Sequence, residues 1–561
     1  MGATKEQSEP APGASPTTAT PAGPGLYRSV ALLSVAGLAV LYFVLNPYFF
    51  GDATWYALDI GNRTVRPADA GHLLWRPLGQ AAWAVLASLG ATDPLTALRA
   101  LSSVAAGALV VATYVLARRL GLGTASAGAA ALMVAGSKMA LAYGGSGCSY
   151  LPAAAFGAAA MLPLARRTER VGVADVILSA GALALAWSMW GIIGLLLPAQ
   201  LVLAWLTFDG PYRSRSLRVG LLGAATLGAI LAIAVAGYLS TSGTHDLAGF
   251  TAWLRASGHG DAPKLSVVGF ARAGIGFFNS FVHLGSLGTS VKGLILRDPG
   301  LVRIGPLLAF GPVLILFVAA VAYSFLGLAR GVIRRESWQW PAAGLALAAV
   351  VPIAAFAATW RGSDVERFSP AVAFVSVAMV FGMARRNART AAVGSGALAL
   401  VVAGALCAGN LATFTTPALV TRGGLVMEVG RAARQHLAAG VLLVVNGREL
   451  GPDVVSAAIY FSKLDVYSIS YELQVFGSAG WRERLEGALC KAIERGARIA
   501  VVSDLLGKPT PGGIGYSPAE FPTPTPDEIA REFTSWEPAG EWSTDRFRFV
   551  VVRPGGVPSC P

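Results

Sequence analysis

The sequence predicts a mainly α-helical membrane protein, a polytopic bundle of about 11 spans with a small C-terminal α/β domain. The 561 residues are 54% hydrophobic and only 13% charged, with a mean hydropathy of +0.58. Soluble domains carry roughly a quarter charged residues. Long apolar runs alternate with short polar segments, which indicates repeated membrane crossings. Helices are the expected spanning element because a lipid-exposed backbone must satisfy its own hydrogen bonds.

The chain divides into three parts. Residues 1–26 are rich in Pro, Ala, Ser, Thr and Gly, which predicts a disordered N-terminal tail. Residues 27–410 hold the apolar runs, and residues 411–561 form a more polar, soluble domain. The first run is too long for a signal-peptide core and has no clear cleavage site, so we expect it to be retained. The expected spans are about 29–50, 97–117, 123–143, 150–165, 172–188, 190–207, 217–239, 305–329, 339–359, 369–384 and 390–409.

Arginines are distributed unequally between the two sides of this bundle. If the N-terminus is cytoplasmic, every inside loop is arginine-rich, whereas the outside loops mix signs or carry little charge, in agreement with the positive-inside rule. An odd number of spans then places residues 411–561 outside. We therefore expect an integral protein of a bacterial cytoplasmic membrane with its N-terminus inside. The inside loops are residues 117–121, 165–170, 211–218, 329–337 and 384–390.

The C-terminal 150 residues alternate strand-like and helix-like segments, which predicts a small α/β domain. It contains no glycine-rich phosphate loop. Cys490 and Cys560 lie in this part and can form a disulfide if the domain is extracytoplasmic. The expected strands are residues 441–447, 498–504 and 546–554, and the expected helices are residues 453–462 and 481–496.

Two carboxylates follow the first span, in FGDATWYALDI (50–60). If this stretch is helical, Asp52 and Asp59 lie nearly two turns apart on one face. A carboxylate at the membrane surface can take a proton from an acceptor hydroxyl or amine. The alternative is that Asp52 is a solvated residue that caps the next helix.

Other charged residues gather on the outside face, where a lipid phosphate would be. The segment WRGSDVERFSP (360–370) carries Arg361, Glu366 and Arg367, and arginine pairs bidentately with phosphate. Lys138, near the outer end of its span, either extends to the interface or contacts a phosphate. His245, His259 and His283 are too widely spaced to indicate a zinc site, and we expect each at the surface.

Three short motifs resemble those of the GT-C membrane glycosyltransferases. They are GDATWY (51–56), HLLWRPLG (72–79) and DVERFSP (364–370), and their order and topology also agree. The match is closest to the protein O-mannosyltransferase and aminoarabinose transferase relatives, of the glycosyltransferase family 39 type, and covers about residues 27–410. The resemblance implies an enzyme that moves a sugar, hexosyl or pentosyl, from a polyprenyl-phosphate donor to a lipid, glycan or protein acceptor on the extracytoplasmic side.

The resemblance also implies roles for individual residues. Asp52 would activate the acceptor, Arg367 would contact the donor phosphate and Glu366 would orient it. His72 and Arg76 would line the donor cavity. Negative charge develops on the phosphate as the sugar bond breaks, and preorganised arginines stabilise it; attack on the opposite face predicts inversion.

The acidic motif departs from the family in one respect. Many relatives carry paired acids where this chain has Asp52 followed by Ala53. Asp59 is the residue that can replace the missing partner. We predict no cofactor and no metal site, and whether a divalent metal takes part is left open.

Two other functions compete with this interpretation. A lipid or sugar transporter or flippase would need charges within the spans or broken helices near the midplane. A non-catalytic scaffold of a cell-envelope complex would use the outer domain alone. The net charge of +13 would suggest nucleic acid in a soluble chain, but here it lies in short loops. The crowding of charges at one surface favours the transferase.

Overall fold

The computed structural model describes most of the membrane region and the elements of the C-terminal sheet, and the statements below concern those residues. The described residues are 24–46, 51–61, 70–90, 93–165, 171–241, 246–256, 265–285, 304–333, 340–359, 364–384, 391–417, 435, 441–445, 465–469, 479–506, 524–543 and 548–554.

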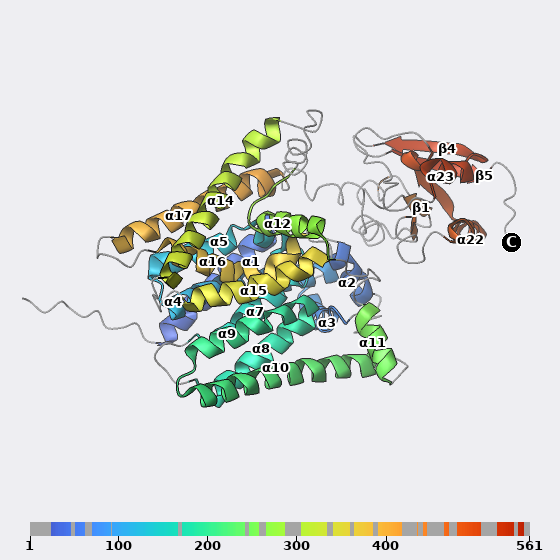
Figure 1. The fold of residues 1–561 in the computed structure, drawn as a ribbon. Helices are drawn as coiled ribbons and strands as arrows, with labels where there is room; N and C mark the ends of the chain where they lie inside the picture. Colours follow the sequence, from blue (N-terminus) through green and yellow to red (C-terminus); the bar gives the residue numbers. More distant parts are fainter. Residues whose placement is uncertain are drawn as a thin grey trace, which may run out of the picture.

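The membrane region is a helical bundle, drawn in blue to orange in Figure 1. Among the described residues, six helices are long and apolar enough to cross a membrane, and five shorter apolar helices accompany them. They correspond to the eleven predicted spans, so the predicted fold class is confirmed. These helices are α1 (Pro24–Leu45), α4 (Pro94–Leu120), α5 (Thr124–Ala135), α7 (Tyr150–Met161), α8 (Val173–Met189), α9 (Leu197–Thr207, preceded by the 3-10 turn η1, Gly191–Leu196), α10 (Tyr212–Thr241), α14 (Ile304–Ile333), α15 (Trp340–Thr359), α16 (Ser369–Met383, preceded by η3, Val365–Phe368) and α17 (Ala391–Asn410, continued by η4, Leu411–Thr415).

The predicted first span, 29–50, is displaced toward the N-terminus in the structure, where α1 ends at Leu45. Asn46 precedes a proline, and a residue in that position is disfavoured in the helical conformation. The guanidinium of Arg99 donates to the carbonyls of Phe43 and Asn46, at 3.0 and 2.7 Å. Arg99 therefore satisfies carbonyls that the helix end leaves without an intrahelical partner.

The predicted span 123–143 is broken in the structure. It consists of α5 and the short α6 (Lys138–Tyr143), separated by Gly136 and Ser137. A Cβ at Gly136 would lie 2.5 Å from the Cβ of Cys407, so the chain passes close to α17 here. The Nδ2 of Asn410 donates to the freed Gly136 carbonyl at 2.8 Å. At 1.5 Å per residue, the 12 residues of α5 extend only about 18 Å along the helix axis. The short α6 then continues the chain to the outer end of the bundle.

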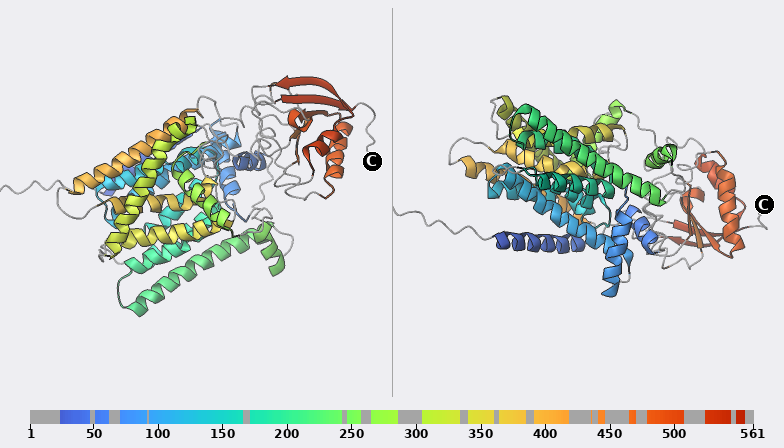
Figure 2. Two further views of the ribbon diagram at one scale, coloured as in Figure 1. Left: turned by 45° about the horizontal axis from the view of Figure 1, so that its top comes forward. Right: turned by 90° about the horizontal axis from the view of Figure 1, so that it is seen from below.

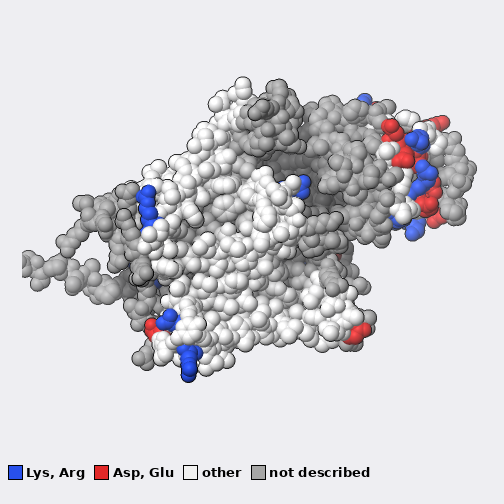
Figure 3. Space-filling view, in the orientation of Figure 1, with Lys and Arg blue, Asp and Glu red and all other residues white. Residues whose placement is uncertain are grey.

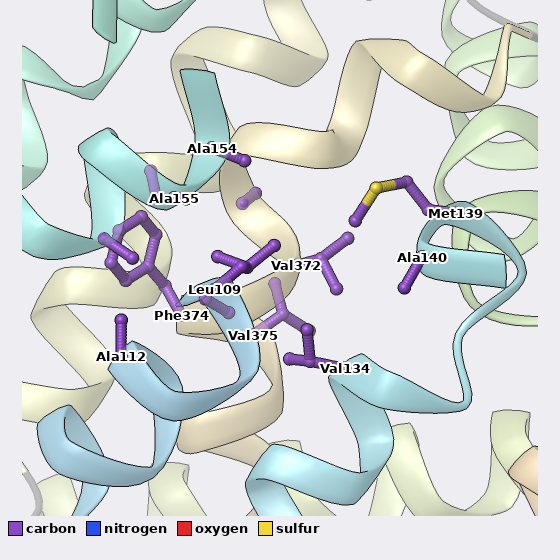
Figure 4. Packing of buried hydrophobic residues seen from close by; sticks show 14 of the residues in the cluster. Leu109, Ala112, Val134, Met139, Ala140, Ala154, Ala155, Val372, Phe374 and Val375 are labelled. Carbon is purple, nitrogen blue, oxygen red and sulfur yellow. The ribbon is translucent and has the colours of Figure 1, made fainter. Parts of the chain in front are cut away.

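The helices pack closely around α16, all 15 residues of which are buried. Figure 4 shows Val372, Phe374 and Val375 of α16 among side chains of α4, α5, α6 and α7. Glycines permit the closest approaches. A Cβ at Gly327 of α14 would lie 2.0 Å from the carbonyl oxygen of Gly382 of α16, and a Cβ at Gly382 would lie 2.1 Å from that of Ser324. Only glycine fits at this crossing.

Polar groups inside the bundle are matched across helices. The side-chain amide of Gln200 on α9 donates to the hydroxyl of Ser179 at 2.8 Å and accepts from that of Thr226 at 3.0 Å. The three residues are fully buried. Interhelical bonds of this type hold membrane helices together where the hydrophobic effect does not.

Four shorter helices lie in the predicted outside loops: α2 (Gly51–Gly61), α3 (Trp75–Ser88), α11 (Leu247–Ala256) and α12 (Val267–Phe281). α2 and α11 lie at the end of the bundle opposite to the start of α1 (Figure 1). The arginine-rich end of α4, which finishes with Arg118 and Arg119, lies at the other end of the bundle (Figure 1). On the face seen in Figure 3, the described charges of the bundle lie mainly near its two ends, and the area between is almost uncharged.

The C-terminal part contains a five-stranded sheet in the order β2-β1-β3-β5-β4. The first three strands are parallel, and β5 and β4 are antiparallel additions. The predicted α/β character is confirmed, although β2, β4 and α23 are not predicted. In the three views of Figures 1 and 2 the sheet lies beyond the end of the bundle that carries α2. The elements are β1 (Val441–Val445), β2 (Asp465–Ser468), α22 (Trp481–Glu494), β3 (Arg498–Val502), η5 (Ser503–Leu506), α23 (Pro526–Glu532), β4 (Trp536–Ser543) and β5 (Arg548–Pro554).

Several predictions fall wholly or partly outside the described residues. They concern most of the tail 1–26, the helix 453–462, Arg361, and the surface positions expected for His245 and His259. Cys490 lies on α22 and is disulfide-bonded, whereas its expected partner Cys560 lies outside the described part of the chain.

Candidate active site

The residues that follow the first span form a helix, which is the condition under which Asp52 and Asp59 share one face. α2 carries both carboxylates, with Asp52 in its first turn, where the partial positive charge of the helix N-terminus favours an anion. Its apolar side is fully buried at Ala53, Ala57 and Ile60. Burial of that side fixes the helix on the bundle and leaves the side chains of Asp52 and Asp59 half-buried.

The hydroxyl of Tyr150, the first residue of α7, donates to Oδ2 of Asp52. Tyr150 is 7% exposed, and its ring packs edge-on against Trp190, with centroids 4.9 Å apart. The two residues of the pair are 98 positions apart in the sequence. A helix contact between α2 and α7 is therefore made through a carboxylate.

Asp59 forms an ion pair with Arg76 of α3, with 2.6 Å between Oδ2 and Nε. The guanidinium lies over the ring of Tyr56, 4.6 Å from its centroid. The Nη1 of Arg76 is buried and has no hydrogen-bond partner among the described residues. A buried guanidinium nitrogen without an acceptor is costly, so this atom is suited to receive a phosphate or hydroxyl oxygen of a ligand.

His72 closes the same cluster from the turn before α3. Its Nδ1 lies 3.0 Å from the carbonyl oxygen of Met189 and 2.8 Å from the hydroxyl of Ser149. Because a carbonyl only accepts, the bond to Met189 requires a proton on Nδ1. The imidazole lies beside Tyr56 and Tyr150, with centroid distances of 5.6 and 6.2 Å.

A second cluster surrounds Glu366, on the 3-10 turn η3 before α16. The hydroxyl of Tyr143 donates to its Oε2 at 2.8 Å. Arg367, 7% exposed, has its Nη2 3.9 Å from Oε1 of Glu366 and 3.7 Å from Oδ2 of Asp364. The predicted pair of Glu366 and Arg367 is thus present as two neighbouring opposite charges, with Arg367 buried and Glu366 partly buried.

Lys138 is directed into the protein at this cluster. Its ammonium donates to Oδ1 of Asn279 on α12 at 2.8 Å, and it interacts electrostatically with Glu366. The Lys138 side chain therefore does not extend to the lipid interface in the structure. A contact between Lys138 and a phosphate, the other alternative, stays a prediction.

His283, which follows α12, also lies in this region, contrary to the prediction of a surface position. It is half-buried between the rings of Phe310 and Phe414, with centroid distances of 5.3 and 5.1 Å. Burial, and to a lesser degree the Lys138 ammonium, lowers the pKa of His283 to about 4. The imidazole is therefore neutral at physiological pH.

The two clusters meet through Tyr143 and Tyr150, whose rings pack edge to face with centroids 5.0 Å apart. Residues 144–149, here called the inter-tyrosine loop, connect them and are entirely buried. Arg99 Nε donates to the carbonyl of Gly145 at 2.8 Å, and Trp75 Nε1 donates to that of Gly147 at 3.1 Å. Gly147 has a φ of +86°, which favours glycine there.

The structure brings together most of the predicted site residues: Asp52, Asp59, His72 and Arg76 in one cluster, and Lys138, Glu366 and Arg367 in the other. Arg361 lies outside the described residues. Sequence reasoning missed Tyr143, Tyr150 and Asn279. A signal was present for the tyrosines, because GGSGCS separates two apolar runs and has a tyrosine at each end.

A metal site is not evident in the described part of the chain, where no three His, Cys, Asp or Glu residues are grouped as ligands. The absence of a metal stays a prediction, as does the absence of any other cofactor.

Comparison with known proteins gives a fold relationship. No protein-family model matches this chain, and no curated protein matches it in sequence. The crystal structure of ArnT from Cupriavidus metallidurans in the apo state aligns with a TM-score of 0.52 at 14% identity, over 94% of this chain and 98% of that chain. ArnT from the same organism bound to undecaprenyl phosphate aligns over the same shares, with a TM-score of 0.49 and 12% identity.

The oligosaccharyltransferase AglB from Archaeoglobus fulgidus, in complex with an inhibitory peptide and a dolichol-phosphate, covers 86% of this chain and 70% of that chain, with a TM-score of 0.46 and 14% identity. The alignment with apo ArnT extends over nearly the whole of both chains, so the fold includes the bundle and the C-terminal part. ArnT is an aminoarabinose transferase of the GT-C type. The predicted GT-C architecture is confirmed at the level of fold.

Proposed function

We propose that this chain is an integral membrane glycosyltransferase that moves a sugar from a polyprenyl-phosphate donor to an acceptor on the extracytoplasmic side. The observation that carries the proposal is the meeting of Asp52 and the Glu366–Arg367 pair at one end of the bundle, through Tyr150 and Tyr143. Proton-accepting and phosphate-binding groups are the two requirements of the reaction. The fold shared with apo ArnT supports the same conclusion.

Each cluster supplies one part of the chemistry. Arg367 and Lys138, with Arg361, would bind the donor phosphate, and Glu366 would hold these cations in place before the donor arrives. Arg76 and His72 would line the cavity for the sugar. As the bond between the anomeric carbon and the phosphate oxygen breaks, the charge on the phosphate is stabilised by the guanidinium groups.

Asp52 would act on the acceptor. Its carboxylate takes the proton of the attacking hydroxyl or amine while a new bond forms to the anomeric carbon from the opposite face. This geometry inverts the configuration of the sugar. We propose that a hexosyl or pentosyl group is transferred and that the acceptor is a lipid, a glycan or a protein. No cofactor is required by these steps.

The topology forms part of the proposal. The N-terminus is proposed to lie inside and the domain of residues 411–561 outside, with residues 27–410 as the catalytic membrane part. The arginine-rich end of α4 is consistent with a cytoplasmic position.

The test compares the parent protein with an Asp52→Asn variant in lipid vesicles. Sugar release is measured with a panel of polyprenyl-phosphate and polyprenyl-diphosphate sugars. Turnover by the parent should fall at least about a hundredfold in the variant, because general-base catalysis contributes roughly 10²–10⁴-fold. Asp209→Asn is the matched control, since Asp209 is exposed in the turn before α10, at the end that carries Arg118.

The outcomes separate the possible functions. Equal turnover in the parent and in Asp52→Asn would remove Asp52 from the chemistry and move the role to Asp59. A folded parent that turns over no donor of the panel would contradict the transferase and favour the transporter or the scaffold.

A further inference from the structure

We propose that Tyr150 is the positioning residue of Asp52, and that the inter-tyrosine loop fixes where Asp52 stands relative to Glu366. The inference rests on the proposed function and names a residue that the motifs do not contain. Tyr150 acts through Asp52 and is not itself a proton acceptor.

Among the described residues, one side chain holds the Asp52 carboxylate. The hydroxyl of Tyr150 donates a hydrogen bond to its Oδ2. The bond holds Oδ2, so the carboxylate is fixed in rotation and its second oxygen remains for the acceptor. A hydroxyl that donates to a carboxylate also stabilises the charged form.

Tyr150 is itself held in place by its neighbours. Its ring is enclosed by Tyr143, Trp190 and His72. The inter-tyrosine loop is held at Gly145 and Gly147 by side chains of α4 and α3, and the amide of Gly147 donates to the hydroxyl of Ser102 at 3.0 Å. The phenol therefore has little freedom to follow a carboxylate that moves.

The two ends of the inter-tyrosine loop are arranged in the same way. Tyr143 at the other end of the loop donates to Glu366 as Tyr150 does to Asp52. Asp52 and Glu366 come from segments 314 positions apart in the sequence, yet a single six-residue loop separates the tyrosines that hold them. The spacing of the proton acceptor and the phosphate-binding pair is thus set by one rigid segment.

The test replaces the donor in two opposite ways. Tyr150→Phe removes the hydroxyl, and Tyr150→3-fluorotyrosine, installed by nonsense suppression, keeps the shape and makes the phenol a stronger donor. Tyr42→Phe is the matched control, because Tyr42 is equally buried and its hydroxyl donates to the carbonyl of Ala135 at 2.9 Å, not to a carboxylate.

Two readouts are recorded for each protein in lipid vesicles. The first is the frequency of the infrared carboxylate band that is lost in Asp52→Asn, recorded at one fixed pH without any substrate. The second is kcat/KM for sugar transfer. Other carboxylates of the chain contribute to the spectrum, so only differences from the parent protein are interpreted.

In Tyr150→Phe the band should shift in frequency because the hydrogen bond to Oδ2 is lost, and kcat/KM should fall roughly ten- to hundredfold, as expected for loss of a hydrogen bond to a charged group. The fluorinated protein, whose phenol is a stronger donor, should shift the band in the opposite direction, and Tyr42→Phe should leave both readouts unchanged. A folded Tyr150→Phe protein with an unshifted band would overturn the inference.

The remaining outcomes also support or contradict the positioning of Asp52 by Tyr150. If Tyr150→Phe does not fold, the fluorinated protein alone gives the answer, because its shape is nearly native: a shift supports the inference and no shift contradicts it. Band shifts in a protein that transfers no sugar would refute the proposed function while the positioning of Asp52 by Tyr150 stands.

Discussion

At the scale of single residues, the site is built from partly buried polar side chains that are paired with one another. Arg76 pairs with Asp59, Glu366 accepts from Tyr143, and Lys138 donates to Asn279. Removal of one partner would leave the other buried and unsatisfied, which typically costs about 1–3 kcal/mol. A variant of any one of these residues should therefore be interpreted together with its partner.

His283 gives a prediction at this scale. Its pKa is lowered to about 4 in the folded protein by burial and by Lys138, and is about 6.5 in the unfolded chain. The unfolded state therefore takes up a proton first as the pH falls. The stability that the neutral imidazole provides is complete above about pH 6.5 and is lost progressively toward about pH 4.

A His283→Phe variant keeps an aromatic ring between Phe310 and Phe414 but does not titrate. The melting temperature of the parent should decrease relative to that of the variant between about pH 7 and about pH 5. Thermal unfolding in the same lipid or detergent at several pH values measures this difference. A difference that stays constant across the range would show that His283 does not titrate as proposed.

At the scale of elements, side chains from one helix repeatedly satisfy the end or the break of another. Arg99 of α4 donates to the last carbonyls of α1, and Asn46 donates to carbonyls near the end of α6. Asn410 of α17 donates to the carbonyl of Gly136, in the break before α6. These partners are remote in sequence, so no local pattern indicates them. Composition predicts that the segment 123–143 is apolar, but the close approach of Gly136 to Cys407, a tertiary contact, decides that it breaks.

The crossing of α14 and α16 gives a prediction for elements. Gly327→Ala or Gly382→Ala would place a Cβ about 2 Å from a backbone oxygen, and backbone cannot move aside without separating the helices. Each variant should lose about 1–3 kcal/mol or more of stability. The melting temperature of the purified protein measures the loss.

Gly228→Ala is the control for this crossing. Gly228 lies within α10, and a Cβ there meets no atom within 4 Å. Alanine at Gly228 should be neutral or stabilise the protein slightly, because it favours a helix by up to about 1 kcal/mol over glycine. Equal effects in α10 and in the α14–α16 crossing would mean that the close approach is not present in the membrane.

At the scale of the whole molecule, the pattern of apolar runs predicts the architecture. It does not predict which side chains contact one another in the site. Eleven apolar segments follow directly from composition, and the strands β1, β3 and β5 from short apolar runs. Strand β4 could not be predicted, because it contains Pro538 and Gly540 beside an irregularity in the register, as edge strands tolerate. The side chains that meet Asp52 and Glu366 depend on packing between distant helices, which a single sequence does not encode locally.

Orientation is the prediction that belongs to this scale. Asp209 and Ala248 are exposed and lie beyond opposite ends of α10. In intact cells, a membrane-impermeant maleimide should label Ala248→Cys and not Asp209→Cys if the N-terminus is inside. Labelling of both after membrane disruption, with the parent as background, completes the measurement. The reverse pattern would contradict the proposed topology and place the site inside.

The inter-tyrosine loop has a consequence for comparing genomes. Segments between helices usually tolerate insertions and deletions, and an alignment program would readily open a gap in GGSGCS. Here each added residue would have to be accommodated inside the protein, where the segment is entirely buried. Related chains are therefore expected to keep six residues between the two tyrosines while their other outer segments vary in length. A search for two tyrosines at that constant interval offers a way to find distant relatives whose overall sequence identity is too low for an ordinary sequence search.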